Sequence, residues 1–554
     1  MKPWYKYYPN GKAPEINYSR YANLGDVLSQ AATQFTDNPA CENFGKQLTY
    51  RQLDRHSRDF AAFLQNHGLK KGDRVAIQLP NLLQNIVAIF GALRAGMVVV
   101  NTNPLYTPRE MEHQFKDSGA VAVVILANFA HNLESIIDKT AIKTVIVTEI
   151  GDMVGGMKGW VMNTAVKHFK KMVPPFKLRG HLKWNRILAE SRLQDFAAPE
   201  ISLDDLAFLQ YTGGTTGVSK GAMLSHRNVT ANLMQVESLL DPIQTGDITI
   251  TPLPLYHIFA LTNSLGYIKL GLNNVLITNP KDLPGFIKEL KKQDFAMLIG
   301  VNTLFNALLN NKEFEHVNFS HLKLAVGGGM AVQQSVSEEW ERVTGKPLIE
   351  GYGLTETSPV LTINPIDGKN HQIGSIGVPI PGTDIQILDE NNSPVKTGEI
   401  GEICAQGPQV MVGYWQRPEA TDEVMIDGWL HTGDMGIIDE NGFIKIVDRK
   451  KEMILVSGFN VYPNEIENVV ASHPKVLEVG AIGVPDDKST EVVKIFVVRK
   501  DLSLTDEELS SYCRDNLTAY KCPKYIEFID ELPKSNVGKV LRRVLKENDS
   551  AQTN

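Results

Sequence analysis

Apolar and polar positions along the first part of the chain follow two alternating periods. Stretches with apolar residues at helical spacing are separated by short, continuous apolar runs, and such runs are typical of strands buried on both faces. This alternation predicts an α/β fold with a parallel sheet that helices cover on both faces. The expected helices are 53–67, 83–95 and one around 111–115, and the expected strands are 74–79, 97–100, 121–126, 142–147 and 206–211.

The pattern near the C-terminus is different. A helix is expected at 464–472, followed by two strands, 476–484 and 492–499, with no helix between them, and then by a helix near 507–516. Strands that follow each other directly favour a separate α+β unit. At 554 residues the chain is also longer than one ordinary core. We therefore expect at least two domains.

A loop rich in glycine and hydroxyl groups follows the expected strand 206–211. Glycines let backbone N–H groups converge on an anion, hydroxyls donate further hydrogen bonds, and a lysine adds positive charge. The Walker pattern does not fit, because Lys220 follows Ser219 and precedes Gly221. The composition therefore favours a phosphate-binding loop of another kind. The loop holds Thr212, Gly213, Gly214, Thr215, Thr216, Gly217, Ser219, Lys220 and Gly221.

Two other interpretations of this loop stay open. The segment 217–221, Gly-Val-Ser-Lys-Gly, matches the nucleophile elbow of serine hydrolases, with Ser219 as the nucleophile. The elbow requires the serine at a sharp turn from strand to helix, whereas the expected strand ends well before Ser219 and a Gly/Thr loop intervenes. A turn with only a structural role is the third interpretation.

Later motifs carry candidate groups for binding a nucleotide and a metal. The expected strand in 322–329 ends in three glycines, which would let a flat ligand approach the backbone. In the segment 350–357, Tyr352 offers a ring face for a base and Glu356 offers a hard oxygen ligand for magnesium. Asp434 is the acid of a glycine-flanked turn, and the segment 533–540 forms a loop with Lys534 and Lys539.

A single histidine, His257, stands among apolar and aromatic neighbours in 253–260. Taken alone, a histidine in such surroundings is more often a core residue than a catalyst.

Together and in this order, these motifs resemble the adenylate-forming superfamily of acyl-CoA synthetases, luciferases and peptide-synthetase adenylation domains. The resemblance covers essentially the whole chain. The segment 428–458 looks like the signature block of fatty acyl-CoA synthetases, and 101–109 and 407–411 resemble bacterial long-chain fatty acid–CoA ligases. The resemblance implies a two-step reaction that uses ATP, Mg²⁺ and coenzyme A. The carboxylate and ATP give acyl-AMP and pyrophosphate, and the CoA thiolate then displaces AMP.

The resemblance also implies the domain organisation. A large N-terminal domain of α/β layers with an additional β subdomain would span 1–447, and a small, mobile α+β domain would span 448–554, with its hinge at Asp448. Asp434 would accept hydrogen bonds from the ribose, and Gly458 would meet the pantetheine arm of CoA. One departure concerns the acyl gate of some relatives, a tryptophan after the histidine, because this chain has Phe259 and no tryptophan there.

Residue roles follow from the same resemblance. Lys539 would bridge the carboxylate and the α-phosphate in the first step, His257 would lie near the activated carboxylate, and Glu356 would bind the metal. The implied catalytic residues are Lys539, His257, Glu356 and Thr212. The implied nucleotide- and CoA-binding residues are Thr212, Gly213, Gly214, Thr215, Thr216, Gly217, Lys220, Gly327, Gly328, Gly329, Tyr352, Gly353, Thr355, Asp434, Arg449 and Gly458.

Composition narrows the classes of protein further. A net charge of −7 argues against a general nucleic-acid binder, and the four cysteines show no metal-binding spacing, which is consistent with a reducing compartment. The N-terminus lacks the apolar core of a signal peptide, and the run 86–100 is too short to span a bilayer. We expect a cytoplasmic enzyme. A serine hydrolase or acyltransferase that uses Ser219, or a non-catalytic lipid-binding protein, are the alternatives, and the oligomeric state, including a homodimer, stays open.

The segment 158–186 differs from the acidic chain around it. It contains eight Lys or Arg residues, no Asp or Glu, and the aromatic residues Trp160, Phe169, Phe176 and Trp184. Apolar residues recur near helical spacing from 161 to 172, until two prolines at 174 and 175 would stop the helix. The segment is either a solvated insertion packed by one face or a surface for an acidic partner or an anionic membrane. In the latter case the enzyme would sit peripherally on the inner face of the membrane.

Overall fold

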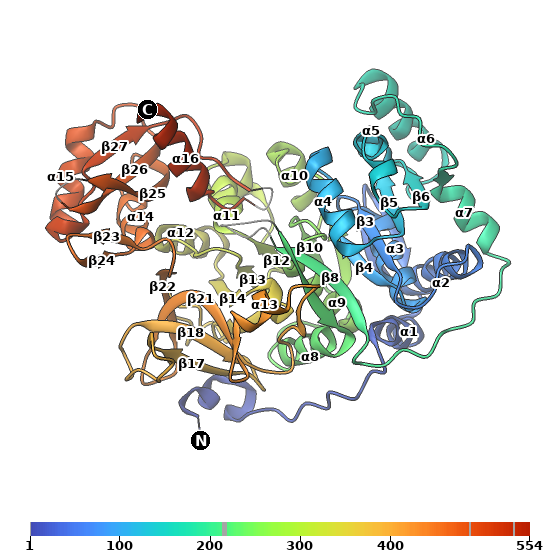
Figure 1. Cartoon of the computed structure of the whole chain (residues 1–554), viewed down its shortest axis with the longest axis horizontal. Helices are drawn as coiled ribbons and strands as arrows, with labels where there is room; N and C mark the ends of the chain where they lie inside the picture. Colours follow the sequence, from blue (N-terminus) through green and yellow to red (C-terminus); the bar gives the residue numbers. More distant parts are fainter. Residues whose placement is uncertain (1, 213–218, 487–488, 536–537, 554) are drawn as a thin grey trace.

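Two large sheets with helices on both faces form the N-terminal part of the chain (Figure 1). The computed structural model describes residues 2–212, 219–486, 489–535 and 538–553. The first sheet has eight strands, and the six from β8 to the edge strand β7 are parallel, whereas β9 and β19 at the other end pair antiparallel. Its order is β19 (Gly413–Tyr414), β9 (Lys220–Ser225), β8 (Leu206–Thr212), β4 (Val98–Asn101), β3 (Arg74–Gln78), β5 (Ala122–Leu126), β6 (Thr144–Thr148) and β7 (Leu182–Lys183).

The second sheet has nine strands and is parallel through its centre. Its antiparallel strands, β2, β15 and β16, lie at the two ends. The order is β16 (Val378–Pro379), β15 (Val360–Ile363), β14 (Leu348–Gly353), β13 (Leu324–Gly327), β12 (Phe295–Gly300), β10 (Ile248–Thr251), β11 (Asn273–Leu276), β1 (Pro39–Asn43) and β2 (Lys46–Thr49).

Helices between the two sheets share one core with both of them. Every residue of α3 is buried, and α3 contacts β3 and β4 of one sheet and β1 of the other. Because α3 has no solvent side, it is apolar on nearly all faces, and its one cation, Arg94, forms an ion pair with Asp54. The helices of this layer are α1 (Leu24–Phe35), α2 (Tyr50–Asn66), α3 (Leu83–Arg94), α8 (His226–Glu237) and α9 (Ile258–Leu270).

Other helices cover the outer faces of the two sheets. Beside the nine-stranded sheet, Phe286, Phe305 and Trp340 form a separate core from α10 (Leu283–Leu290), α11 (Asn302–Leu309) and α12 (Gln334–Thr344). Beside the eight-stranded sheet, Met111 and Phe115 of α4 (Pro108–Ser118) pack with α5 (Ala130–Glu134). The predicted α/β fold, with helices on both faces of a parallel sheet, is confirmed, and the predicted strands match β3 to β6 and β8 within two or three residues.

Two smaller sheets follow along the chain. The first is the expected β subdomain, with β17 (Asp384–Leu388), β18 (Gly401–Gln406), β20 (Met425–Ile426), β21 (Trp429–Ile438) and β22 (Ile444–Arg449). The second belongs to the C-terminal α+β unit, with β23 (Ile454–Val456), β24 (Phe459–Val461), β25 (Val476–Asp486), β26 (Thr490–Arg499) and β27 (Tyr525–Phe528). The helices α14 (Pro463–Ala471), α15 (Asp506–Asn516) and α16 (Arg542–Thr553) complete that unit.

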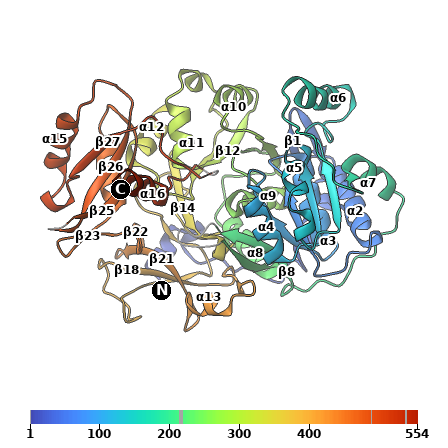
Figure 2. The ribbon, with the colours of Figure 1, turned by 45° about the horizontal axis from the view of Figure 1, so that its top comes forward.

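The basic segment forms α6 (Gly156–Thr164), which continues as a π turn, Ala165–Phe169, and is followed later by α7 (Trp184–Ser191). The helix therefore ends before the two prolines that were expected to stop it. Figures 1 and 2 both show α6 and α7 at the end of the molecule opposite the C-terminal unit. In the part of the chain that the structure describes, no helix is long and apolar enough to cross a membrane.

Candidate active site

The predicted phosphate loop connects β8 and β9 as a hairpin. Thr212 ends β8 and pairs with Lys220, which begins β9. The glycines and threonines from Gly213 to Gly217 lie outside the described residues. Ser219 directly precedes β9, and the next helix, α8, begins only at His226. Since the serine does not sit at a turn from strand to helix, the nucleophile-elbow interpretation is wrong.

Lys220 and Glu356 come together through a residue that the sequence motifs did not single out, Tyr414 of β19. The Lys220 ammonium lies 5.2 Å from the centre of the Tyr414 ring, within range of a cation–π contact. The Tyr414 hydroxyl donates a hydrogen bond of 2.6 Å to Oε1 of Glu356. Tyr414 thereby connects the end of the phosphate loop to the candidate metal ligand.

The candidate adenine and ribose residues come from the ends of β13 and β14 and from the β subdomain. Gly328 is tightly packed, because a Cβ there would lie 3.2 Å from both the Phe259 ring and the carbonyl of Gly351. The Tyr352 hydroxyl donates a 2.7 Å hydrogen bond to Oδ2 of the buried Asp434. Backbone that approaches this closely leaves a flat surface beside a buried carboxylate, as a nucleoside requires.

Gly353 has a steric role of its own. A Cβ at this position would lie 1.8 Å from the carbonyl oxygen of Pro359. Leu354 also donates its backbone N–H to that carbonyl, at 3.1 Å. Any side chain at position 353 would therefore displace the short helix Thr355–Thr357, which carries Thr355 and Glu356.

Lys539 reaches this site from the C-terminal unit. Thr303 of α11 donates its hydroxyl to the carbonyl of Gly538 at 3.1 Å, and Asn306 donates to the carbonyl of Leu477 at the same distance. Burial, together with the charge of the nearby Arg449, lowers the pKa of Lys539 from 10.5 to about 8, although Asp434 opposes the shift. The lysine thus lies near Asp434, the candidate ribose-binding residue, although Asp434 precedes it by about one hundred positions in the sequence.

His257 faces the same lysine. Its Nδ1 accepts the backbone N–H of Phe259 at 3.3 Å and so caps the N-terminus of α9. In the neutral ring this leaves the proton on Nε2 as a free donor. Burial lowers the pKa of His257 to about 4, and the charge of Lys539 adds to that shift. His257 therefore stays neutral at physiological pH, with both a structural role as a cap and a donor available to a ligand.

The predicted hinge residue, Asp448, is completely buried within β22. Its carboxylate accepts the backbone N–H of Arg449 at 2.7 Å and of Asn464 at 2.8 Å, and Nη1 of Arg542 lies 3.2 Å away. Burial raises the pKa of Asp448, and Arg542 opposes that shift. The strand β22 pairs with β21 through Arg449, so the β subdomain's sheet extends slightly past the predicted boundary at 447.

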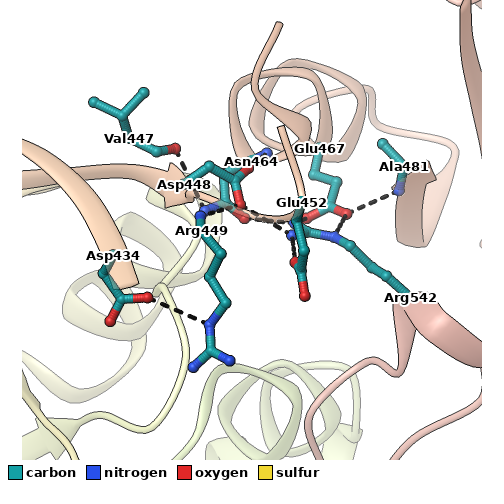
Figure 3. Close-up of polar contacts among 9 residues, drawn as sticks. All are labelled: Asp434, Val447, Asp448, Arg449, Glu452, Asn464, Glu467, Ala481 and Arg542. Carbon is teal, nitrogen blue, oxygen red and sulfur yellow. Dashed lines mark hydrogen bonds and ion pairs between the residues drawn. The ribbon is translucent and has the colours of Figure 1, made fainter. Parts of the chain in front are cut away.

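Arg542 joins Asp448 to the C-terminal unit, as Figure 3 shows. Its Nε and Nη2 form a two-pronged contact with Glu467, at 2.9 and 2.6 Å, and Nη2 also donates to Oδ1 of Asn464. Glu452 forms a further ion pair with the same guanidinium. Burial lowers the pKa of Arg542, but the charges of Glu467 and Asp448 outweigh it and hold the pKa above its usual value. The guanidinium therefore fixes the C-terminal unit relative to the strand that leads into it.

Arg449 points toward the nucleotide residues on the other side of the hinge. Its Nε lies 3.3 Å from Oδ1 of Asp434, and the two residues are also register partners in β21 and β22. Gly458 lies apart, on an exposed turn between β23 and β24, with a positive φ of 85°. The structure thus brings together the described residues at 327–329, Tyr352, Asp434, Arg449 and Lys539. The sequence motifs did not single out Tyr414, Thr303 or Arg542 as parts of this site, since none of them belongs to a glycine-rich motif.

Comparison with known proteins identifies two family models in the chain. Residues 28–415 match the AMP-binding enzyme family, and residues 465–539 match the AMP-binding enzyme C-terminal domain. A curated protein from Escherichia coli named long-chain-fatty-acid–CoA ligase is 56% identical over 550 residues, which cover 99% of this chain and 98% of that protein.

Solved structures give a similar result. The ATP-bound structure of MatB from Rhodopseudomonas palustris has a TM-score of 0.81 at 29% identity and covers 95% of this chain and 99% of MatB. The apo structure of the same protein, at 30% identity and the same coverage, has a TM-score of 0.74. The arrangement of this chain is thus more similar to the ATP-bound form.

The contacts of Arg542 give a testable prediction about the hinge. Changing Arg542 to Gln removes the cation that compensates Asp448 and Glu467, and a buried charge left without its partner costs about 3 to 5 kcal/mol. We expect faster hydrogen exchange at the amides of Asn464 and Ala481, which donate to these two carboxylates. Exchange followed by mass spectrometry would measure this.

The neighbouring Arg543 provides the matched control. Its side chain is 64% exposed and, among the described residues, pairs only with Glu547 at 3.5 Å, so Arg543→Gln should leave the exchange unchanged. The account of the hinge would be contradicted if both variants exchanged like the wild type.

Proposed function

The chain belongs to the family of AMP-binding enzymes, and from this premise we propose that it is a long-chain fatty acid–CoA ligase. The observation that carries the proposal is the position of Lys539, buried and within electrostatic range of Asp434, Arg449 and His257. It agrees with the name of the Escherichia coli relative, to which the chain is similar over its full length.

In the first step, a carboxylate oxygen of the fatty acid attacks the α-phosphorus of ATP. The bond from the α-phosphorus to the oxygen that bridges to the β-phosphate breaks, and pyrophosphate leaves. Both partners are negatively charged, so the step needs positive charge and hydrogen-bond donors between them. Lys539 supplies the ammonium, His257 a neutral N–H, and Lys220 with Thr212 binds the departing phosphates at the hairpin.

The nucleoside is held by residues from β13, β14 and the β subdomain. Asp434 accepts from the ribose hydroxyls, Tyr352 stacks on the adenine, and the glycines 327–329 allow the base to lie against the backbone. Thr355 donates to the α-phosphate. Because the Tyr352 hydroxyl already donates to Asp434, the carboxylate that would bind the ribose is oriented before the nucleotide arrives.

Magnesium fits the carboxylate of Glu356. Tyr414 occupies one of its oxygens, which leaves the second for a hard cation. The structure contains no group of three or more acidic, histidine or cysteine ligands among its described residues. Mg²⁺ is commonly held by one or two carboxylates together with substrate phosphates, so a single carboxylate beside the phosphate hairpin suits it. When bound, the ion would neutralise charge on the phosphates.

In the second step, the CoA thiolate attacks the acyl carbonyl carbon and AMP leaves. Lys539 is buried in the candidate site, whereas Gly458 lies on an exposed turn outside it. We therefore propose that residues 448–554 form a domain that rotates about Asp448 between the steps, removing Lys539 and bringing Gly458 inward. The higher similarity to ATP-bound MatB supports assigning the described arrangement to the first step.

We also propose that α6 and the π turn after it bind an anionic membrane. Trp160 is 64% exposed and Phe169 83% exposed, and Met157, Val161 and Met172 are exposed as well. A solvated insertion packed by one face would bury these side chains, whereas Gly159 is the only buried residue of α6. Exposed aromatic residues among lysines suit the interface of a bilayer, from which a long-chain fatty acid must be taken.

The division of labour between the two steps can be tested with Lys539→Ala. Acyl-AMP formation should fall about a hundredfold or more, because the ammonium acts on the charge that develops in that step. Transfer from supplied acyl-AMP to CoA should stay close to wild type, since it uses the other orientation. Equal losses in both half-reactions would rule out two orientations.

The lowered pKa of Lys539 predicts the pH dependence of the first step. The ammonium is the active form, so kcat/KM for acyl-AMP formation should fall as the pH rises through about 8, the pKa of the free enzyme. Lys539→Arg keeps its charge at alkaline pH, so any remaining activity of this variant should lack the falling limb. An identical alkaline limb in both proteins would assign it to another group.

Membrane binding can be tested by sedimentation with anionic and neutral vesicles. Changing Lys167, Lys170, Lys171 and Lys177 to Gln should weaken binding to anionic vesicles at least about tenfold, since each basic residue near the surface contributes roughly 1 kcal/mol. A variant with the same change of charge elsewhere, at the exposed Lys281, Lys288, Lys312 and Lys346, should bind like the wild type. Indifference of the wild type to lipid charge would refute the membrane surface.

A further inference from the structure

A cavity of about 620 Å³ lies at the end of the molecule that carries α6 and α7, and it shares no lining residue with the candidate active site. Its walls come from β2, α2, the segment 152–156 that leads into α6, and α7. Lys158 of α6 donates to the carbonyl of Phe44, next to β2, so α6 is attached beside the cavity.

Three cations line this cavity without an ion-pair partner. Lys46, Arg55 and Arg192 are exposed, and none of them forms a salt bridge with any described residue. Arg51, on the same helix as Arg55, forms an ion pair with Asp37 at 3.1 Å and so differs from these three cations. Three unpaired cations around one opening create a site for a multiply charged anion.

His56 and Asp59, which also line the cavity, favour a neutral hydroxyl group of the ligand over an anionic one. Nε2 of His56 lies 3.5 Å from the Arg55 guanidinium, which can only donate, so the ring proton belongs on Nδ1. Nδ1 is buried and has no hydrogen-bond partner, and it lies 4.0 Å from Oδ2 of Asp59, too far for a direct bond. Burial, with the charges of Arg55 and Arg192, lowers the pKa of His56 to about 4, so the ring is neutral. A ligand hydroxyl placed between Nδ1 of His56 and Oδ2 of Asp59 would accept a hydrogen bond from His56 and donate one to Asp59.

We propose that this cavity binds a phosphorylated polyol, with the phosphate between Lys46, Arg55 and Arg192 and a hydroxyl between His56 and Asp59. The buried Leu48, Met153 and Leu188 supply an apolar wall for the carbon backbone of such a ligand. The same chemistry occurs in a soluble glycerol phosphate and in the head group of phosphatidylglycerol. The position next to α6 suits the lipid, but the site does not depend on the proposed enzymatic activity.

Binding of glycerol 3-phosphate to the full-length protein, measured by titration calorimetry with saturating ATP to occupy the nucleotide site, tests the proposal. The wild type should bind one equivalent. Arg55→Gln and Arg192→Gln should each weaken binding at least about tenfold, because each removes a charged hydrogen-bond donor from the phosphate. Arg51→Gln, on the same helix but paired with Asp37, is the matched control and should bind like the wild type.

The hydroxyl contact is tested with inorganic phosphate, which lacks it and should bind more weakly to the wild type. Asp59→Ala should reduce this difference. Binding to vesicles of phosphatidylglycerol, compared with vesicles of phosphatidylcholine, distinguishes the source of the ligand. If the protein binds phosphatidylglycerol vesicles and Arg55→Gln loses this binding, the ligand is the lipid. If the protein binds only the soluble glycerol 3-phosphate, the ligand is a soluble metabolite.

The absence of saturable binding to both ligands, or binding that neither arginine variant weakens, would overturn the site. Equal affinity for inorganic phosphate and glycerol 3-phosphate would overturn the role of His56 and Asp59. Pyrophosphate release by both arginine variants should equal that of the wild type at saturating substrate, so failure of this proposal is distinguishable from failure of the proposed enzymatic function.

Discussion

The compensation of one buried carboxylate, Asp448, determines how the two parts of this protein are arranged. A carboxylate with no solvent access must accept hydrogen bonds and be balanced by a cation. Two backbone amides meet the first need, and Arg542, which Glu467 and Asn464 hold in place, meets the second. Because Lys539 lies only three residues before Arg542, the same contacts that satisfy the hinge also place the lysine in the active site.

In the proposed two-step reaction, this coupling would let one chain serve two steps that need different surroundings. Adenylation needs cations around two anionic partners, whereas thioester formation needs room for an incoming thiol. Of the two amides that donate to Asp448, that of Arg449 lies in β22 and that of Asn464 lies in α14 of the C-terminal unit, so the carboxylate contacts both parts. Among the described residues, α11 gives the C-terminal unit two hydrogen bonds, from Thr303 to Gly538 and from Asn306 to Leu477, and neither involves a charged group, in contrast to the contacts of Asp448 with Arg542.

Much of the fold follows from the sequence alone, and the reasons are local. Continuous apolar runs fix β3 to β6, and glycine clusters mark where β8 and β13 end. The sequence could not predict that Tyr414 bridges Lys220 and Glu356, because that contact joins residues far apart in the chain and depends on the pairing of β9 with β19. Arg542 was missed for the same reason. The helix predicted from the spacing of 161–172 is confirmed as far as residue 169. Apolar spacing alone, however, does not distinguish a packed face from the exposed face that the structure shows.

The proposed function requires that this protein activate long-chain fatty acids by adenylation. Its most direct test is pyrophosphate release by the wild type in the presence of ATP and Mg²⁺, with a panel of carboxylates from acetate to octadecanoate and with CoA present. We expect pyrophosphate release to depend on the carboxylate and to be strongest with the long chains. Equal amounts of AMP and acyl-CoA should form with the pyrophosphate. Release of inorganic phosphate in place of pyrophosphate, or hydrolysis of acyl esters without ATP, would contradict it.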